Sequence, residues 1–294
     1  MTFSENSTTP DVALRTQTLP GETPTVVFIN GLGETLDFWH PVTVRLDGVD
    51  MLLYDRAVCS LDEPEGTLAA EIEHIDKVLS AVVGTVVLVG HSYGGILAEA
   101  YTRARPDRVG GLILLDPSVP AEYADSTDSS VGKVRRGSQR AMTSTRVRPV
   151  LKRVLPRAMV SFGTYTNSAG KILKTLPEDL AQRLSDPRHI ERAIYDNTHV
   201  GNICAELLDQ RTETALPAIP VHIMVGALGP RMWPRKQHSW IAEQRKQLEA
   251  FGPDAHLVEL DGAHMLMLDC PDDVCAAIRG VHADISDSVV APSQ

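Results

Sequence analysis

A serine between glycines, in the segment Gly90-His91-Ser92-Tyr93-Gly94, is the strongest candidate for chemistry in this chain. It follows a β-branched run over 85–89 that predicts a buried strand, and it precedes a helical pattern over 93–103. Small flanking residues allow a sharp strand-to-helix turn, which exposes the hydroxyl at a helix N-terminus where developing negative charge is favoured. We therefore predict that Ser92 is a nucleophile, the alternative being a serine in an ordinary glycine-rich turn.

A histidine near the C-terminus, His264, is the candidate general base among ten histidines. It lies in Asp261-Gly262-Ala263-His264, between a predicted strand over 256–260 and a predicted helix over 271–281. This loop is expected at the same edge of the sheet as Ser92, whereas His256 is expected at the opposite edge. The side chain of His91 is expected to point away from Ser92, into the packing. A purely structural loop histidine is the alternative for His264.

The elements that must position these side chains alternate between short apolar runs and helical patterns. We predict strands over 11–19, 25–29, 50–54, 85–89, 111–115, 221–225 and 256–260, and helices over 36–46, 67–83, 93–103, 238–251 and 271–281. Strands rich in Val, Ile and Leu that alternate with helices predict an α/β fold with a mostly parallel sheet covered on both faces. The predicted organisation is a core of residues 1–116 and 217–284, an inserted helical cap or lid over 117–216, and a flexible tail over 285–294.

These motifs resemble the α/β-hydrolase superfamily, in the branch of small bacterial hydrolases with a helical cap, over about 19–115 and 218–281. The resemblance implies the α/β-hydrolase fold and a chemical toolkit, but no particular substrate. The loop that ends in His264 resembles the family's catalytic histidine loop. The segment Asn30-Gly31-Leu32-Gly33 resembles the family's His-Gly-x-Gly loop, and by that match the amides of Leu32 and Tyr93 form the oxyanion hole. Asn30 replaces the commoner histidine, and its side chain could order the loop by its own hydrogen bonds.

The acidic partner of His264 departs from the commonest pattern of the superfamily. In most members the acid follows the strand predicted here over 221–225, but residues 226–235 contain no Asp or Glu. A minority of the superfamily places the acid one strand earlier, which is the position of Asp116. A carboxylate there would fix the tautomer of His264 and stabilise its charged form. The alternatives are that Asp116 only caps a turn, or that Asp261 or Asp269 is the acid.

Further candidates surround the predicted site. We expect Asn30, Gly31 and Trp233 to contact substrate, with core packing as the alternative for Trp233. Cys59 is either a pocket residue or a buried, inert thiol. The basic run over 133–157 contains no acid and is expected to be a solvated helix face or a lid, the alternative being attraction of an anionic substrate or a lipid headgroup.

Composition narrows the classes of function. The chain has 294 residues and a formal net charge of -10, which argues against a nucleic-acid partner. Four scattered cysteines without a CxxC pair fit reduced thiols in a cytoplasmic enzyme, and we expect no metal and no cofactor. Neither a signal peptide nor a transmembrane segment is expected.

The sequence thus predicts a serine hydrolase that cleaves a carboxylic ester, lactone or thioester through an acyl-enzyme on Ser92. The expected partner is a small-molecule substrate, which could be anionic or linked to an acyl carrier, and a homodimer is left open. The alternatives are the same fold with other chemistry (a carbon–carbon bond hydrolase, an acyltransferase or a cofactor-free lyase or cyclase) and a non-catalytic ligand-binding protein. The identity of the substrate and the length of its acyl group stay open.

Overall fold

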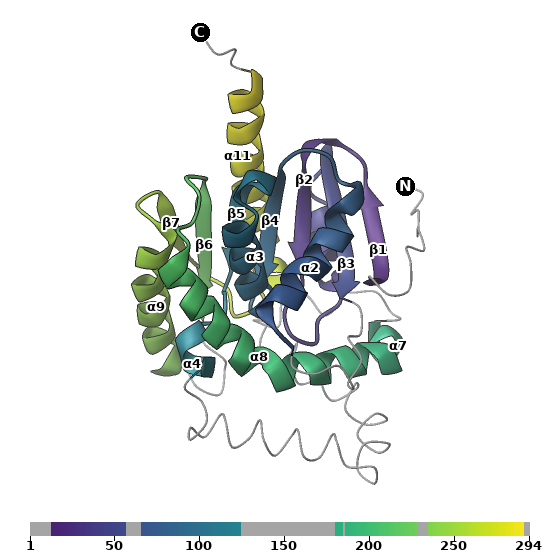
Figure 1. Ribbon diagram of the computed structural model, residues 1–294. Coiled ribbons are helices and arrows are strands. Elements are labelled where there is room, and N and C mark those ends of the chain that lie inside the picture. Colours follow the sequence, from purple (N-terminus) through teal and green to yellow (C-terminus); the bar gives the residue numbers. More distant parts are fainter. Residues whose placement is uncertain (1–12, 57–65, 125–179, 185, 229–234, 291–294) are drawn as a thin grey trace.

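A seven-stranded sheet lies at the centre of the computed structural model, which describes residues 13–56, 66–124, 180–184, 186–228 and 235–290 (Figure 1). The strand order is β1-β3-β2-β4-β5-β6-β7, with β1 antiparallel to β3 and the other neighbours parallel. The prediction of a mostly parallel sheet is confirmed. The strands are β1 (Ala13–Leu19), β2 (Glu22–Ile29), β3 (Val49–Arg56), β4 (Val86–His91), β5 (Val109–Leu115), β6 (Val221–Gly226) and β7 (Ala255–Leu260).

Helices cover both faces of the sheet, because successive apolar residues of each strand point to opposite sides. The α-helices of the described residues are α1 (His40–Thr43), α2 (Leu68–Val78), α3 (Tyr93–Ala104), α4 (Pro120–Ala124), α7 (Leu180–Arg183), α8 (Pro187–Glu213), α9 (Arg235–Gln247), α10 (Leu266–Asp269) and α11 (Pro271–Val290). Short 3₁₀ segments are η1 (Leu36–Trp39), η2 (Leu79–Ala81), η3 (Pro106–Arg108) and η4 (Leu248–Phe251).

Alternate residues of each inner strand enter two separate hydrophobic clusters. In β4, Val86 and Leu88 pack on one face with α2, α3 and α8, whereas Val87 and Val89 pack on the other face with α1, α10 and α11. All four side chains are fully buried. Because both faces of the sheet are buried, the sequences of the inner strands are nearly continuous runs of Val, Ile and Leu.

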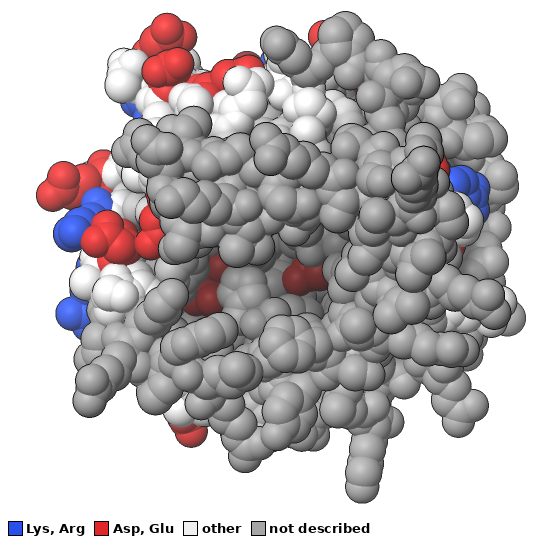
Figure 2. Space-filling view, turned by 90° about the horizontal axis from the view of Figure 1, so that it is seen from below, with Lys and Arg blue, Asp and Glu red and all other residues white. Residues whose placement is uncertain are grey.

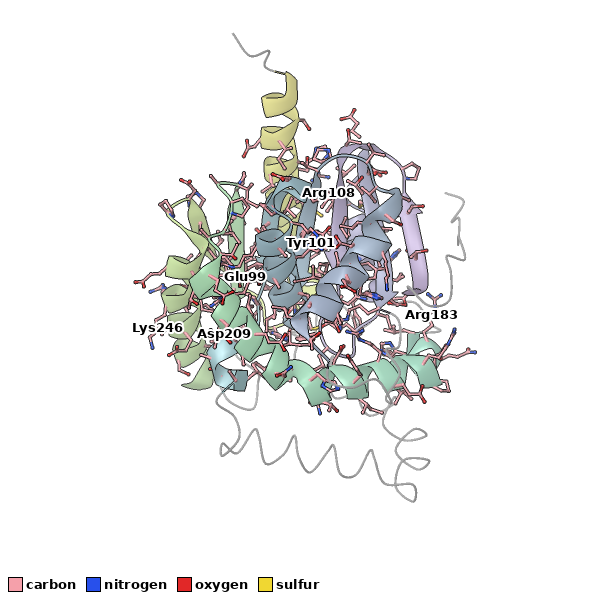
Figure 3. The ribbon with its side chains drawn as sticks, in the orientation of Figure 1. Glu99, Tyr101, Arg108, Arg183, Asp209 and Lys246 are labelled. Carbon is pink, nitrogen blue, oxygen red and sulfur yellow. The ribbon has the colours of Figure 1, made fainter. Side chains whose placement is uncertain are left out.

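The helix α8 belongs to the segment over 117–216 that the sequence predicts to be a cap. Its side chains Ile203, Cys204 and Leu207 are fully buried in the same cluster as α2 and α3. A buried carboxylate, Glu99 of α3, which is labelled in Figure 3, adds an ion pair with Arg211 of α8 at 2.6 Å. This end of the segment therefore packs directly against the core. Residues 125–179 lie outside the described residues, and the division into core and cap stays a prediction.

Two elements differ from the sequence-based expectation. The helix expected over 36–46 is split into η1 and α1, because the ring of Pro41 cannot follow an α-helical turn without clashing with the carbonyl four residues earlier. The helix α11 continues to Val290, past residue 285 where the flexible tail was expected to begin. Ile285 of this helix is 8% exposed, and its side chain packs over Gly110 and Gly111 of β5. This contact anchors the C-terminal part of the helix.

The approach of α3 to β2 provides a test of the packing. A Cβ atom on Gly94 would lie 2.2 Å from the carbonyl oxygen of Ile29, a distance that only backbone movement can relieve. We expect Gly94→Ala to destabilise the fold by about 1–3 kcal/mol or more, measured as a lower midpoint of urea unfolding. The matched control is Gly280→Ala on the exposed side of α11, where a Cβ meets nothing within 4 Å, and we expect it to stabilise by about 0.5–1 kcal/mol. Equal midpoints for the Gly94 variant and the unmodified protein would contradict this packing.

Candidate active site

The predicted site residues come together where the parallel strands end. The carboxyl ends of β2, β4, β5 and β6 point toward the side of the sheet along which α8 runs (Figure 1). Ser92 directly follows β4, Asp116 directly follows β5, and His264 lies in the loop after β7. Figure 2 shows this side of the molecule, where several Asp and Glu residues are visible.

The turn that carries Ser92 has an unusual backbone. Ser92 has φ 53° and ψ -119°. Residues other than glycine rarely adopt such a positive φ. The turn is held by three hydrogen bonds: Ser92 N donates to Leu115 O at 3.0 Å, and Ser92 O accepts from the amides of Gly95 and Ser118. A Cβ on Gly90 would meet the Gly94 carbonyl at 2.5 Å, so the glycines are needed for the crossing of strand and helix.

The imidazole of His264 lies between Ser92 and Asp116. Its Nε2 is 3.1 Å from Ser92 Oγ, and its Nδ1 is 2.6 Å from Asp116 Oδ2. Since a carboxylate only accepts hydrogen bonds, Nδ1 carries the proton and Nε2 is left to accept the hydroxyl proton of Ser92. The structure therefore brings the three predicted side chains into one continuous chain of contacts.

Asp116 is held by groups on two other elements. Its Oδ1 accepts hydrogen bonds from Gly226 N at the end of β6 (3.2 Å) and from Trp240 Nε1 of α9 (2.9 Å). Asp116 is 3% exposed and has φ 41°, again in the left-handed region. Asp269, one of the weaker candidates, accepts a hydrogen bond from the amide of Ala263 at 2.9 Å. Sequence analysis missed Trp240, because no motif connects a tryptophan in α9 with a carboxylate after β5.

The loop over 30–33 is fixed by contacts to its side chains and its backbone. The Asn30 side chain donates to Tyr54 O (3.1 Å) and Asp55 Oδ1 (3.3 Å) and accepts from Trp39 Nε1 (2.7 Å). It is 2% exposed, so these contacts give it an ordering role, and its contact with a substrate stays a prediction. The carbonyl of Gly31 accepts from Arg56. Trp233, Cys59 and the basic run over 133–157 lie outside the described residues.

A buried ion pair, which the sequence analysis did not find, connects three parts of the site. His91 Nδ1 lies 2.7 Å from Glu34 Oε1, and His91 Nε2 lies 2.9 Å from the carbonyl oxygen of His264. Glu34 Oε2 accepts the amide of Gly31 at 2.6 Å. The rings of His91 and His264 are 4.7 Å apart. The pair thus joins the loop over 30–33, the serine turn and the histidine loop.

The hydrogen-bond partners of His91 determine its charge. A carbonyl and a carboxylate both accept, so an imidazole between them is favoured as the doubly protonated cation. Burial lowers the pKa of His91, but the charge and contact of Glu34 together with the His264 carbonyl and the charge of Asp116 outweigh it, and the pKa is raised above its ordinary value. Burial raises the pKa of Glu34, but His91 and the Gly31 amide outweigh it and the pKa is lowered. His91 is fully buried, as expected for a side chain within the packing, but the sequence analysis gave it no partner.

The family follows from comparison with known proteins. A model of the alpha/beta hydrolase family matches residues 26–277. The chain belongs to the alpha/beta hydrolase family. This confirms the resemblance and the fold class predicted from the sequence.

Two curated relatives are similar to part of this chain. Lipase LipV of Mycobacterium tuberculosis is 35% identical over 103 residues, which cover 32% of this chain and 37% of the lipase. A proline iminopeptidase of Saccharolobus solfataricus is 33% identical over 97 residues, which cover 30% of this chain and 31% of the peptidase. The chain thus matches about a third of the length of these relatives.

Solved structures share the fold over nearly the whole chain. A thermophilic esterase from Thermogutta terrifontis has a TM-score of 0.64 at 18% identity, covering 97% of this chain and 98% of the esterase. The epoxide hydrolase CorEH has a TM-score of 0.71 at 14% identity, covering 97% of this chain and 99% of that enzyme. At these identities the likeness is one of fold alone.

Among the described residues, no helix is both long and apolar enough to cross a membrane. In the same part of the chain, no group of three or more His, Cys, Asp and Glu side chains is arranged to hold a metal ion.

The ion pair predicts how stability depends on pH. The raised pKa of His91 contributes stability below its unfolded value of about 6.5, and this is lost as the pH rises through the folded pKa. The lowered pKa of Glu34 contributes stability above its unfolded value of about 4.3, and this is lost as the pH falls through the folded pKa. We expect Glu34→Gln to lower the free energy of unfolding by about 1–3 kcal/mol, with the largest loss between about pH 4.5 and 6.5.

Urea unfolding of both proteins from pH 4 to 9 measures this difference. Glu73→Gln, which removes the same charge from an exposed position on α2, is the control and should show a small loss without that pH profile. A loss for the Glu34 variant that stays constant across the range would contradict the charged pair.

Proposed function

We propose that this protein is a serine hydrolase that cleaves a carboxylic ester, lactone or thioester through an acyl-enzyme on Ser92. The observation that carries the proposal is the chain of contacts from Asp116 through His264 to Ser92, at 2.6 and 3.1 Å. This is the arrangement of nucleophile, base and orienting carboxylate that acyl transfer requires. The unusual backbone of Ser92 also supports it, since strained residues cluster at sites where their geometry is used.

In the proposed mechanism the Ser92 Oγ attacks the acyl carbonyl while His264 Nε2 takes its proton. Asp116 stabilises the resulting imidazolium, which then gives the proton to the leaving alcohol or thiol. Water repeats the sequence on the acyl-enzyme: His264 accepts a water proton, the hydroxide adds to the acyl carbon, and the acid leaves as Ser92 regains its proton. Each tetrahedral intermediate carries a negative oxygen, which the amides of Leu32 and Tyr93 are proposed to stabilise.

The packing of α3 against β2 supports this assignment of the two amides. Gly94 and the end of β2 are in close backbone contact, so the loop that contains Leu32 starts beside the N-terminus of α3, where Tyr93 lies. Ser92 N is engaged by Leu115 O and Gly31 N by Glu34, so neither of these neighbours is available as the donor.

The breadth of the family keeps the choice of substrate open. The names of a lipase, an esterase and a proline iminopeptidase among the similar proteins support acyl transfer to water. An acyltransferase, a carbon–carbon bond hydrolase or a cofactor-free lyase would use the same site, and a product assay distinguishes them. A small-molecule substrate, a cytoplasmic location and a homodimer stay predictions.

Replacing the nucleophile tests the proposal. We expect Ser92→Ala to lower kcat by roughly 10⁶-fold, the size of effect known for comparable sites, in a screen of p-nitrophenyl esters, lactones and acyl thioesters. A fluorophosphonate probe should label the unmodified protein at Ser92 and leave the variant unlabelled. The control is Ser80→Ala at an exposed position of η2, which should keep full activity and labelling. Near-full turnover in the Ser92 variant would end the proposed mechanism.

Replacing the acid tests the less common position of Asp116. Asp116→Asn keeps the shape of the side chain but favours the wrong tautomer of His264, so we expect kcat to fall by about 10⁴-fold. The urea midpoint, measured alongside, separates this effect from loss of the fold. Asp107→Asn at an exposed position of η3 is the matched control. Unchanged turnover in a folded Asp116 variant would assign the acid elsewhere.

A further inference from the structure

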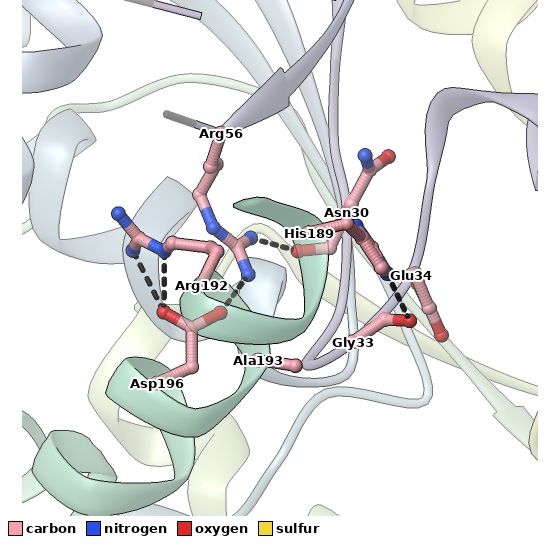
Figure 4. Close-up of a pocket in the computed structure, with 8 residues that line it drawn as sticks. All are labelled: Asn30, Gly33, Glu34, Arg56, His189, Arg192, Ala193 and Asp196. Carbon is pink, nitrogen blue, oxygen red and sulfur yellow. Dashed lines mark hydrogen bonds and ion pairs between the residues drawn. The ribbon is translucent and has the colours of Figure 1, made fainter. Parts of the chain in front are cut away.

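The carbonyl oxygens of the loop over 30–33 are held by side chains from outside the loop. Arg56, at the end of β3, donates through Nη1 to Asn30 O and through Nη2 to Gly31 O, the latter at 3.1 Å. His189, near the N-terminus of α8, contacts Gly33 O through Nε2 at 3.1 Å. Three of the four carbonyls around Leu32 are therefore fixed, and a small cavity lies between them and α8 (Figure 4).

Arg56 is in turn fixed by α8. Its Nη2 lies 2.6 Å from Oδ2 of Asp196, whose Oδ1 accepts from Arg192 at 2.7 Å, as Figure 4 shows. Arg192 also pairs with Glu71 of α2 at 2.6 Å. The side chains of Arg56, Arg192 and Asp196 are at most 4% exposed. Charges of alternating sign thus run from α2 through α8 to the loop, shielded from solvent.

The protonation states fit these contacts. Burial raises the pKa of Asp196, but Arg192 and Arg56 outweigh it and hold the pKa below its ordinary value, so the carboxylate is ionised. Burial lowers the pKa of His189, so its imidazole is neutral near pH 7. Since a carbonyl oxygen only accepts, His189 Nε2 must carry the proton and donate to Gly33.

The geometry of the peptide bond connects these contacts with catalysis. In a trans peptide the C=O of Gly31 and the N–H of Leu32 share one plane and point in opposite directions. A guanidinium on the Gly31 oxygen therefore sets the direction of the Leu32 N–H and also polarises it. A donor of an oxyanion hole must be aimed before the reaction, because misplacement by about 1 Å can cost roughly a hundredfold in rate.

We propose that Asp196 and His189 of α8 are positioning residues for the oxyanion hole: Asp196 acts through Arg56, and His189 acts on Gly33. This inference rests on the proposed function, since it assigns work to the amide of Leu32. It gives α8, which lies within the segment of the chain predicted to be a cap, an indirect part in stabilising the transition state. The oxyanion develops only in the transition state and the tetrahedral intermediates, so we expect loss of these contacts to lower kcat and leave KM nearly unchanged.

The test uses two substitutions at one position. His189→Leu removes the donor, whereas His189→Gln keeps an N–H at the place of Nε2. We expect His189→Leu to lower kcat about ten- to a hundredfold with KM within about twofold, and to weaken binding of a boronic acid, which forms a tetrahedral adduct on Ser92, by the same factor. His189→Gln should stay within about threefold of the unmodified protein on both measures.

A control on α8 separates positioning from packing. Asn202 donates to Gly66 O at 3.1 Å, a contact of the same helix with a different loop. Asn202→Ala should leave kcat and boronic acid affinity unchanged. Asp196→Asn should reproduce the effect of His189→Leu wherever it folds, as checked by its urea midpoint. Unchanged kcat and boronic acid binding in His189→Leu, or equal losses in Asn202→Ala, would overturn the proposal.

Amide hydrogen exchange makes the two proposals distinguishable. If the unmodified protein neither hydrolyses any acyl substrate nor reacts with fluorophosphonate at Ser92, the proposed function fails. Whether α8 orders the loop is then tested by hydrogen exchange at the amides of Gly31 and Glu34, which are hydrogen-bonded to each other's residue. Faster exchange in His189→Leu than in His189→Gln supports it, and equal exchange overturns it.

Discussion

The close backbone contact between the start of α3 and the end of β2 is the constraint on which the rest of the site depends. At Gly94 the two backbones are too near for any side chain, with a Cβ position only 2.2 Å from the Ile29 oxygen. This contact places the Ser92 turn beside the loop that contains Leu32. The left-handed φ of Ser92 follows from the same crossing, because the chain must reverse within one residue. Strain at this point is sustained by the buried strands on both sides, which cannot move independently.

Around this crossing, charged side chains are buried in ion pairs. Members of these pairs form hydrogen bonds to backbone groups of the site. Glu34 and His91 connect the loop over 30–33 with the carbonyl of His264, and Arg56 with Asp196 connects the same loop with α8. A buried ion is costly unless its remaining hydrogen bonds are made. Here carbonyls and amides of the site make several of them, although Arg56 Nε has no partner among the described residues. The low-dielectric surroundings that make such pairs costly also strengthen their hydrogen bonds, so each pair helps to fix the geometry of a loop.

The position proposed for the acid differs from the one that most of the superfamily uses. Most members carry the carboxylate after the strand that corresponds to β6, but residues 227 and 228 after this strand are not acidic, and Gly226 at its end donates its N–H to Asp116. The carboxylate that contacts His264 follows the neighbouring strand β5 instead. Trp240 of α9 supplies the second hydrogen bond to the same oxygen. Because β5, β6 and β7 are parallel neighbours, β5 and β6 both end at the edge of the sheet where the histidine loop lies.

The sequence by itself predicted a mostly parallel sheet and the chain order of its strands, because apolar periodicity is a local signal. Glycine spacing pointed to Ser92, whereas His264 and Asp116 were proposed through the resemblance to the family, with Asp261 and Asp269 as alternatives for the acid. The break of the helix expected over 36–46 into η1 and α1 could also have been predicted from Pro41, but the sequence analysis did not use this signal. Only the tertiary structure decided the partners of Glu34, His91, Asp196 and His189. These contacts join residues from separate elements, up to 173 positions apart for His91 and His264. From sequence alone, a charged side chain is expected to lie on the solvated surface. It becomes buried beside its counterion only when distant segments pack together.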